Sequence, residues 1–379
     1  MPDLLLHPLT LRGLYLVAMA KAALRFYNPR RRASGRHQDA FYMRTWKEAG
    51  EEIGATWTPL RDDMGELELD GRRTRVVGNV SEIDGPVTLA VLHDKPLTHK
   101  LVSAEGLPVP RHAIFTTKSM KVAMQFMQTI SGDCVVKPAG GTGGGRGVAT
   151  GIRTKGQLVR AAAAASVYAD ELMIEEQITG DNYRLLYLDG KLVDAFVRRL
   201  PSVTGDGKLT VKQLVEQHND ERLKSGAGMS QVLLTIDYDM RRTLDKQGLS
   251  LGAVPTAGRV VTLKTAVNEN CGADNSTVTH LLHRSIVADG ARVAATLNAR
   301  FIGIDIIMRD PSVPLRESGG VILEVNGTPN LYYHYNKKDG ATPVAVPLLR
   351  RLLLEDRDDA SSGNYERFGA SSKGEVSRV

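Results

Sequence analysis

Cysteine is scarce in this chain, and no apolar run in it is long. Its 379 residues include only two cysteines, Cys134 and Cys271, which lie far apart in the sequence. Two isolated cysteines do not make a disulfide framework, so we expect a cytoplasmic protein in a reducing compartment. No apolar stretch reaches the roughly 20 residues of a transmembrane helix, so we expect no membrane partner.

Neither sign of charge dominates the composition. The chain has 49 Lys and Arg against 43 Asp and Glu, which gives a net charge of +6. This small excess does not by itself indicate nucleic acid, and it suits anionic substrates or nucleotides equally well. Hydrophobic residues at 42% and charged residues at 24% are ordinary for a soluble globular protein. The length allows about two to three domains.

The first 36 residues are expected to form an N-terminal helix (1–28) and a basic linker. The apolar segment 14–20 ends in Ala-Met-Ala, as a signal peptide can, but Lys21 follows at once and the apolar spacing is helical. We therefore expect an amphipathic helix that serves packing or contact within a homodimer. Three consecutive arginines from Arg30 begin the linker, and such a basic run is usually solvated rather than bound to nucleic acid.

Turn residues divide the rest of the chain into a small α/β domain (37–95), a larger unit (96–355) and a tail (356–379). The tail is polar and without period, so we expect it to be disordered. In the small domain we expect one helix and three short strands, over 41–53, 67–69, 74–77 and 87–92.

The larger unit mixes helical and strand-like patterns, which predicts an α/β (α+β) fold class. The expected helices are 97–105, 119–130, 155–169, 209–219 and about 277–300. The expected strands are 134–138, 171–175, 183–188, 191–197, 260–265, 301–308 and 321–326. Asp189-Gly190, between two of these strands, predicts a hairpin turn.

Oxygen-bearing side chains interrupt the last two apolar strands. Asp305 lies within 301–307, and Glu324 and Asn326 lie two apart in 321–326, so the latter two share one face of their strand. An unpaired carboxylate in an apolar strand would cost several kcal/mol, roughly, and needs a cation. Three oxygen donors on two strands are typical of a Mg²⁺ site for phosphoryl chemistry. The alternative is that Asp305 and Glu324 each bond a nearby Lys or Arg.

A glycine-rich loop follows the strand 134–138. Six of the nine residues in 139–147 are glycine, so backbone N–H groups can approach phosphate oxygens closely. It is not a P-loop, because no Gly-Lys-Ser/Thr ends it, and no acidic strand end follows as in a dinucleotide fingerprint. Lys137 precedes the loop by two residues, which favours a phosphate clamp that closes over a nucleotide. A flexible hairpin tip is the simpler alternative.

The segment 174–184 supplies groups suited to a nucleoside. Its strand edge and glutamates can bind an adenine edge, and a polar side chain a few residues on can reach a ribose. Without a nucleotide, the same segment is only a strand, a turn at Gly180 and a second strand.

These features occur in the order found in the ATP-grasp superfamily, and the chain looks most like the ATP-grasp module of cyanophycin synthetases. The residues that carry the resemblance are Lys100, Lys137, the glycine-rich loop, Glu175 to Ile178, Arg184, Gly303-Ile-Asp305 and Glu324-Val-Asn326. The blocks 203–210 and 316–326 resemble the same group. The resemblance covers about residues 96–350 and implies an ATP-grasp domain of two lobes that clasp ATP, preceded by a small pre-ATP-grasp domain.

The resemblance assigns nucleotide-binding roles by position. The residues placed at the ATP phosphates are Lys100, Lys137, Gly141, Gly143, Gly144 and Gly145. Glu175 is placed at the adenine amino group, with Gln177 and Ile178 at the hinge backbone. Asn182 is placed at the ribose, where the family usually has an acidic residue.

The resemblance also implies a metal centre and a catalytic set. Asp305, Glu324 and Asn326 would hold two Mg²⁺ ions, for which Mn²⁺ can substitute. Arg184 would face an acyl phosphate, with Arg316 as a weaker candidate for the same charge, and Lys137 would assist phosphoryl transfer. One departure is Asn268-Glu-Asn-Cys-Gly-Ala, where the family has Asn-x-Ser-x-Gly-Gly.

The function implied is an ATP-dependent carboxylate–amine ligase that forms an amide through an acyl phosphate and releases ADP and phosphate. Small-molecule or peptide carboxylates and amines would be its substrates. Arg198 and Arg199 suggest an anionic acyl donor, or simply a solvated face. Cyanophycin synthetases continue into a second ligase domain, whereas this sequence stops soon after the ATP-grasp core. We therefore expect a stand-alone enzyme that makes one kind of bond. The alternatives are an ATP-grasp small-molecule kinase and a nucleotide-dependent RNA-binding protein.

Overall fold

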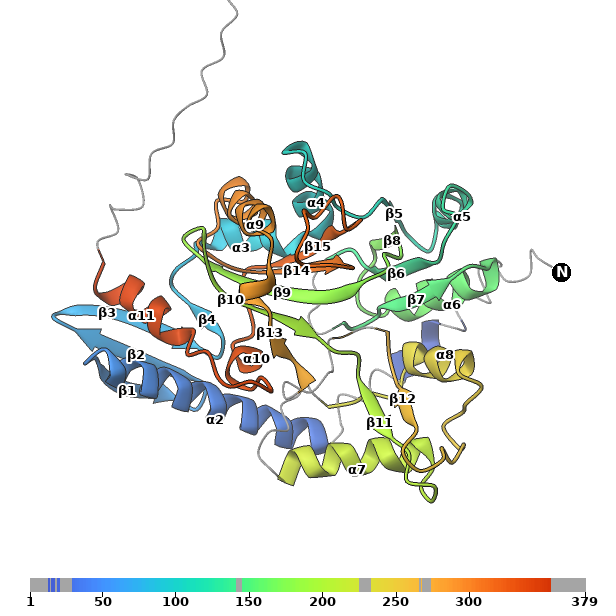
Figure 1. Cartoon of the computed structure of the whole chain (residues 1–379), viewed down its shortest axis with the longest axis horizontal. Helices are drawn as coiled ribbons and strands as arrows, with labels where there is room; N and C mark the ends of the chain where they lie inside the picture. The colour runs from blue at the N-terminus through green and yellow to red at the C-terminus, as the bar shows by residue number, and fades with distance from the viewer. Residues whose placement is uncertain are drawn as a thin grey trace, which may run out of the picture.

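The structure is a computed structural model that describes residues 13, 15–17, 19–20, 29–140, 145–224, 233–265, 267 and 274–355. The expected helix over 1–28 falls mostly outside the described residues, and the expected disordered tail falls wholly outside them. Within the described part the strands form four sheets, with helices between and around them (Figure 1).

The N-terminal part consists of a long helix and an antiparallel sheet. The helix is α2 (Pro29–Glu52), and the strands, in sheet order, are β1 (Thr56–Arg61), β2 (Met64–Leu69), β3 (Arg72–Val77) and β4 (Val80–Ser81). The expected basic linker is wrong, because its residues 29–36 form the first turns of α2. Proline suits the first turn of a helix, and arginine is a good helix former.

The strand expected over 87–92 is also wrong, because these residues form the helix α3 (Pro86–His93). Pro86 opens the helix, and its fixed φ favours a helical first turn. A six-residue apolar run has too few periods to separate a strand from a helix. The next helix, α4 (Lys95–Ala104), confirms the one expected over 97–105.

The central sheet has five strands. In sheet order they are β13 (Ser276–Thr277), β10 (Lys191–Arg198), β9 (Asp181–Leu188), β14 (Phe301–Met308) and β15 (Val321–Asn326). The expected β9–β10 hairpin is confirmed. Its turn residues Asp189 and Gly190 have φ of 46° and 72°, the left-handed conformation that an Asp-Gly turn requires.

The two faces of the central sheet bury different things, because side chains alternate along each strand. One face is apolar and packs beneath α3, α4 and α9 (Arg284–Thr296), which lie above the sheet in Figure 1. Leu185, Tyr187 and Ile304 belong to the core on this face. The opposite face carries apolar residues at one end and charged residues at the other.

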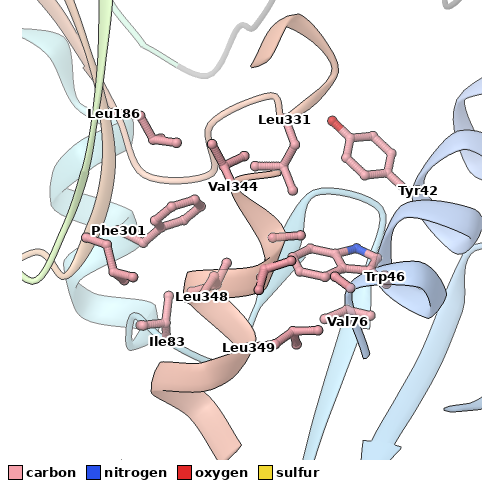
Figure 2. Close-up of a cluster of buried hydrophobic side chains, with 14 of the residues drawn as sticks. Tyr42, Trp46, Val76, Ile83, Leu186, Phe301, Leu331, Val344, Leu348 and Leu349 are labelled. Carbon is pink, nitrogen blue, oxygen red and sulfur yellow. The ribbon is translucent and has the colours of Figure 1, made fainter. Parts of the chain in front are cut away.

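The apolar end of that second face joins a core built from both halves of the chain. Leu186 and Phe301 of the central sheet meet Trp46 of α2 and Leu349 of α11 (Ala345–Leu353). Figure 2 shows these side chains converging from the sheet and the two helices. Helix α11 therefore packs between the N-terminal sheet and the central sheet, in the core that they share.

A second lobe, the smaller lobe, is built on a four-stranded antiparallel sheet. Its strands, in sheet order, are β5 (His112–Phe115), β8 (Leu172–Glu176), β6 (Cys134–Pro138) and β7 (Ala149–Ile152). The helices α5 (Met120–Gln128) and α6 (Lys155–Ala165) pack on it. The strand expected over 134–138 is confirmed with both its bounds.

The remaining elements form a third unit with a core of its own. They are β11 (Ser202–Thr204), α7 (Val211–Lys224), α8 (Tyr238–Lys246) and β12 (Val260–Thr262). Two short helical turns, η4 (Thr279–Leu281) and α10 (Tyr332–Tyr335), complete the described elements. The helix expected over 277–300 begins only at Arg284, because β13 pairs with β10 before it. No helix in these described ranges has the length and apolar character of a membrane span.

We predict that the α11 contact is needed for stability. Leu349 is completely buried, so Leu349→Ala should lower the free energy of unfolding by about 2–5 kcal/mol. Val87 is 77% exposed, and Val87→Ala should change it by no more than about 0.5 kcal/mol. Urea unfolding of both variants measures the difference. Equal, small effects would show that α11 is only loosely attached.

Candidate active site

A row of charged side chains crosses the second face of the central sheet. Strand register places Arg184 of β9 directly opposite Asp305 of β14, and Asp305 directly opposite Glu324 of β15. Directly paired residues of antiparallel strands project to the same face. The three side chains expected to carry phosphoryl chemistry are thus neighbours, although they are up to 140 residues apart in the sequence.

Asp305 is the centre of this row. Arg184 binds it with two hydrogen bonds, from Nε to Oδ1 at 2.5 Å and from Nη2 to Oδ2 at 2.9 Å. Arg198 Nη1 lies 3.5 Å from Oδ2. Burial alone would raise the pKa of Asp305, but the charges of the two arginines outweigh burial and lower that pKa. The carboxylate is therefore ionised at neutral pH.

Gly303 leaves the space that the Arg184 guanidinium occupies. A Cβ at position 303 would lie 2.7 Å from Arg184 Nη1 and 3.1 Å from Pro329 Cβ. No side chain fits there unless Arg184 moves. The Gly303-Ile-Asp305 sequence therefore supplies both the carboxylate and the room for the cation that holds it.

Glu324 and Asn326 extend the row towards helix α4. Lys95, at the start of α4, places its Nζ 3.2 Å from Glu324 Oε1, with both side chains largely buried. Asn326 lies opposite Gly303, close to Asp305 in the row, and its Nδ2 is buried without a hydrogen-bond partner in the described residues. Both carboxylates therefore meet cations here, which is the alternative that the sequence left open.

A second buried ion pair lies in the other lobe. Lys137 of β6 and Glu175 of β8 meet at 2.8 Å, with side chains 7% and 3% exposed. The sequence placed Lys137 at ATP phosphates and Glu175 at the adenine amino group. The structure brings the two together, and Glu175 Oε2 has no partner among the described residues.

His99 of α4 connects the two ion pairs. Its Nε2 lies 3.0 Å from the carbonyl oxygen of Leu323, and its ring lies edge-to-face 5.0 Å from that of His112. Burial, helped by the charge of Lys137, lowers the pKa of His99 to about 3. The imidazole is therefore neutral, Nε2–H donates to Leu323, and α4 is tied to both sheets.

The root of the glycine-rich loop lies beside α4. Gly140 forms an isolated antiparallel bridge with Asp94, the residue before Lys95. A Cβ on Gly140 would lie 3.2 Å from the carbonyl oxygen of His93, so this close approach favours glycine. Gly145 has φ of 69°, a conformation that glycine adopts without strain. Gly141, Gly143 and Gly144, also expected at the phosphates, lie outside the described residues, as does Asn268.

The expected hinge follows β8. The Gln177 backbone N–H donates to the carbonyl oxygen of Asp133 at 2.9 Å, and its side chain accepts from Gly151 N at 2.7 Å. Ile178 follows and is half-buried. Asn182, expected at the ribose, is 9% exposed, and its Oδ1 has no partner in the described part of the chain.

Two expected site residues are not brought to this cluster. Lys100 lies on the exposed side of α4, whereas Lys95 and His99 of the same helix face the site. Arg316 is exposed and donates to the carbonyl oxygen of Gly106, beyond the other end of α4. Of the lysines of α4, Lys95 and not Lys100 lies at this cluster, and the roles expected for Lys100 and Arg316 stay predictions.

A buried network lies next to the charged row and was not foreseen. Asp194 of β10 accepts a hydrogen bond from His334 Nδ1 at 2.7 Å and one from Lys337 Nζ at 2.9 Å. Burial lowers the pKa of His334 more than Asp194 raises it. The network fixes α10, whose Tyr333 lies under the Arg198 guanidinium at 5.3 Å. No sequence pattern joins Asp194 to residues 140 positions away.

The donor set at positions 305, 324 and 326 fits a hard divalent cation in kind. Carboxylate and amide oxygens on adjacent strands are the ligands that Mg²⁺ prefers. Among the described residues no group of three or more His, Cys, Asp or Glu side chains could hold a metal ion, so the amide of Asn326 and phosphate oxygens would have to complete the shell. Lys95 and Arg184 would then have to turn towards anionic ligands.

Known proteins are similar to this chain in sequence over most of its length. A cyanophycin synthetase of Nostoc sp. (strain PCC 7120 / SAG 25.82 / UTEX 2576) is 30% identical over 338 residues, which are 88% of this chain and 37% of that protein. The glutathione biosynthesis bifunctional protein GshAB of Mannheimia succiniciproducens is 27% identical over 284 residues, 73% of this chain and 36% of that protein.

The fold agrees with these relatives. The crystal structure of a bifunctional glutathione synthetase from Pasteurella multocida superposes with a TM-score of 0.53 and 22% identity, over 81% of this chain and 43% of that one. The chain belongs to the ATP-grasp superfamily. No family model matches it. This ATP-grasp chain spans a little over a third of the length of the relatives it matches.

The two lobes of the ATP-grasp fold carry the two ion pairs described above. Lys137–Glu175 belongs to the smaller sheet and Lys95–Glu324 joins α4 to the central sheet, with His99 between them. The place where α4 meets both lobes is the junction between them. The expected site residues that lie in or beside this junction are Lys137, Glu175, Arg184, Asp305, Glu324 and Asn326. Their assignments to particular ligand atoms stay predictions.

The neutral state of His99 predicts a pH dependence of stability. Its pKa is lowered in the folded protein from 6.5, so this group stabilises the fold above pH 6.5 and the stabilisation is lost as pH falls from 6.5 towards 3. The slope from this one group is at most about 1.4 kcal/mol per pH unit. His99→Gln, which can still donate to Leu323, should flatten the acid limb of the unfolding curve.

Urea unfolding at a series of pH values measures this effect. The exposed His280 is the control, and His280→Gln should leave the acid limb as in the wild type. If His99→Gln unfolds with an unchanged pH dependence, His99 is not held neutral by its burial at the lobe junction.

Proposed function

We propose that this chain is an ATP-dependent carboxylate–amine ligase. It forms an amide bond, peptide or isopeptide, through an acyl phosphate and releases ADP and phosphate. The observation that carries the proposal is the row Arg184–Asp305–Glu324, flanked by Lys95 and Asn326, on one face of the central sheet. Relatives named cyanophycin synthetase and GshAB support it.

The reaction needs positioning and charge more than a nucleophile from the protein. ATP and a substrate carboxylate are both anionic, so they approach each other only where cations offset their repulsion. Lys137 of the smaller lobe and Lys95 of α4 are the two buried lysines on either side of the junction. In our proposal they bind the phosphates of ATP, and the glycine-rich loop covers them.

Arg184 acts at the next step. Its guanidinium lies over Gly303, beside the expected metal ligands, and its plane is held by Asp305. We assign it to the acyl phosphate, where its charge stabilises the intermediate until an amine displaces phosphate. Glu175, Gln177, Ile178 and Asn182 are assigned to the adenosine part.

Asp305, Glu324 and Asn326 would hold Mg²⁺, two ions by family analogy, with Mn²⁺ as a substitute. The bound metal supplies Lewis-acid stabilisation of the transferring phosphoryl group. Lys95 and Arg184, which contact Glu324 and Asp305 in this structure, would then bind phosphate oxygens in our proposal.

The proposed substrates are amino acids or peptides, one as the carboxylate donor and one as the amine. The proposed domain division stays 37–95 for the pre-ATP-grasp part and 96–355 for the ATP-grasp part, with the change that α2 begins at Pro29. A cytoplasmic location, a homodimer and the lack of a nucleic-acid partner stay predictions from the sequence.

Hydroxylamine tests the reaction directly. With ATP, Mg²⁺ and a panel of amino acids and dipeptides, the wild-type protein should release ADP and convert at least one carboxylate into a hydroxamate, because hydroxylamine replaces the natural amine. A stable phosphoester without hydroxamate would instead indicate a kinase. Pyrophosphate release would contradict the acyl-phosphate mechanism.

We predict that Glu324→Gln and Asp305→Asn lose the reaction. Each variant removes a charge at the expected metal centre, which should lower the rate of ADP release by at least about 10²–10³-fold. The exposed Glu317→Gln is the control and should retain the wild-type rate. Thermal unfolding checks that the variants are folded, since Asp305→Asn leaves two buried arginines without a carboxylate. Wild-type-like ADP release by both variants at saturating Mg²⁺ would contradict the assignment.

A further inference from the structure

We propose that Arg198 binds a second anionic group on the carboxylate substrate, next to the carboxylate that is activated. The donor would then be a dicarboxylate, or a peptide whose reacting residue carries an acidic side chain. This inference rests on the proposed ligase function and narrows its substrate class.

The structure separates Arg198 from its neighbour Arg199. Arg199 has a side chain that is 54% exposed, and it lies 3.6 Å from the exposed Asp181. Arg198 has a side chain that is only 4% exposed and projects onto the charged face of the sheet. Arg198 is the last residue of β10 and Arg199 follows the strand, and only Arg198 of this pair reaches the site.

The charges in the row do not balance. Lys95 pairs with Glu324, and Arg184 binds Asp305 with two hydrogen bonds. Arg198, whose Nη1 lies 3.5 Å from Asp305 Oδ2, is a third cation, so the three cations exceed the two carboxylates by one positive charge. A buried guanidinium that shares a carboxylate with another arginine is costly unless a further anion approaches it.

The hydrogen bonds of Arg198 are also incomplete. Its Nη2 donates to the carbonyl oxygen of Val267 at 3.3 Å, but its Nε is buried with no partner in the described residues. Asn182 is directly opposite on β9 and has a partnerless Oδ1, yet it does not accept from Arg198. A buried donor without an acceptor loses the hydrogen bond that it had in water, and a bound carboxylate would restore one.

The guanidinium is held for planar recognition. Its Cζ lies 5.3 Å from the ring centre of Tyr333, which supports one face of the group. Tyr333 is itself buried and belongs to α10, which the Asp194 network anchors to β10. A guanidinium supported on one face presents its edge, the geometry that binds a carboxylate with paired hydrogen bonds.

The position of Arg198 relative to Arg184 sets where the second anion lies. Arg184 is opposite Phe196, and Arg198 is two residues further along β10, on the same face. Adjacent strands are about 5 Å apart. A donor whose activated carboxylate meets Arg184 can therefore place a nearby carboxylate at Arg198, on the side of the row away from Glu324.

Matched donors test this assignment. The hydroxamate assay is run with the pairs Ala-Asp and Ala-Asn, Ala-Glu and Ala-Gln, aspartate and asparagine, and glutamate and glutamine, which differ only in the second carboxylate. The wild-type protein should favour the acidic member of at least one pair by about 10-fold or more in kcat/KM, since the amide cannot neutralise Arg198.

The arginine variants identify the cause. Arg198→Met should lose about 10–100-fold in kcat/KM for the acidic donor and change the amide donor by less than about 3-fold, which removes the preference. Arg198→Lys, which keeps the charge, should restore part of it. Arg199→Met is the control and should behave as the wild type. Thermal unfolding verifies that each variant is folded. If Arg198→Met is not folded, the proposal is judged from the donor preference of the wild type and of Arg198→Lys.

The outcomes separate the two proposals. If no carboxylate yields a hydroxamate, the ligase function and this inference both fail. If hydroxamates form but the wild type shows no preference for acidic donors, only this inference fails. Equal losses for acidic and amide donors in Arg198→Met would place Arg198 at the reacting carboxylate or the phosphate, and would likewise overturn it.

Discussion

The Asp305 carboxylate, buried between two arginines, is the interaction on which the site depends. Burying a charge is costly, and the cost is offset only where opposite charges and hydrogen bonds surround it. Arg184 and Arg198 do this from two neighbouring strands, and Gly303 gives one of them its space. Arg184, Asp305 and Glu324 lie side by side on this end of the sheet.

Helix α4 gives the site its second constraint. Its first residue, Lys95, meets the central sheet, and one turn later His99 contacts the backbone of that sheet and the ring of His112 in the smaller lobe. Burial lowers the pKa of His99, the charges of Lys137 and Lys95 lower it further, and the histidine is therefore neutral. The junction between the lobes is therefore tied together by uncharged contacts, and the lysines remain for anions.

Much of this arrangement could be predicted from the sequence, and the failures have physical causes. The strands 301–308 and 321–326 were bounded correctly, because turn residues flank strongly apolar runs. The run 87–92 was assigned to a strand because periodicity is ambiguous over six residues. The contact of Lys95 with Glu324 was not expected, because a lysine at the start of a helix has the same sequence appearance whether it faces solvent or a carboxylate. Arg198 and Arg199 could be separated only by strand register.

The core in Figure 2 has a consequence for how the chain folds. Tyr42 donates a hydrogen bond to Asn330, 288 residues away, and α2 packs against α11. Contacts between such distant segments close a very long loop and form late, because the intervening chain must first be ordered. During synthesis, Trp46 and its neighbours are exposed until α11 has emerged from the ribosome. The N-terminal sheet is thus made first but completed last, and this interval is when the nascent protein is most open to aggregation.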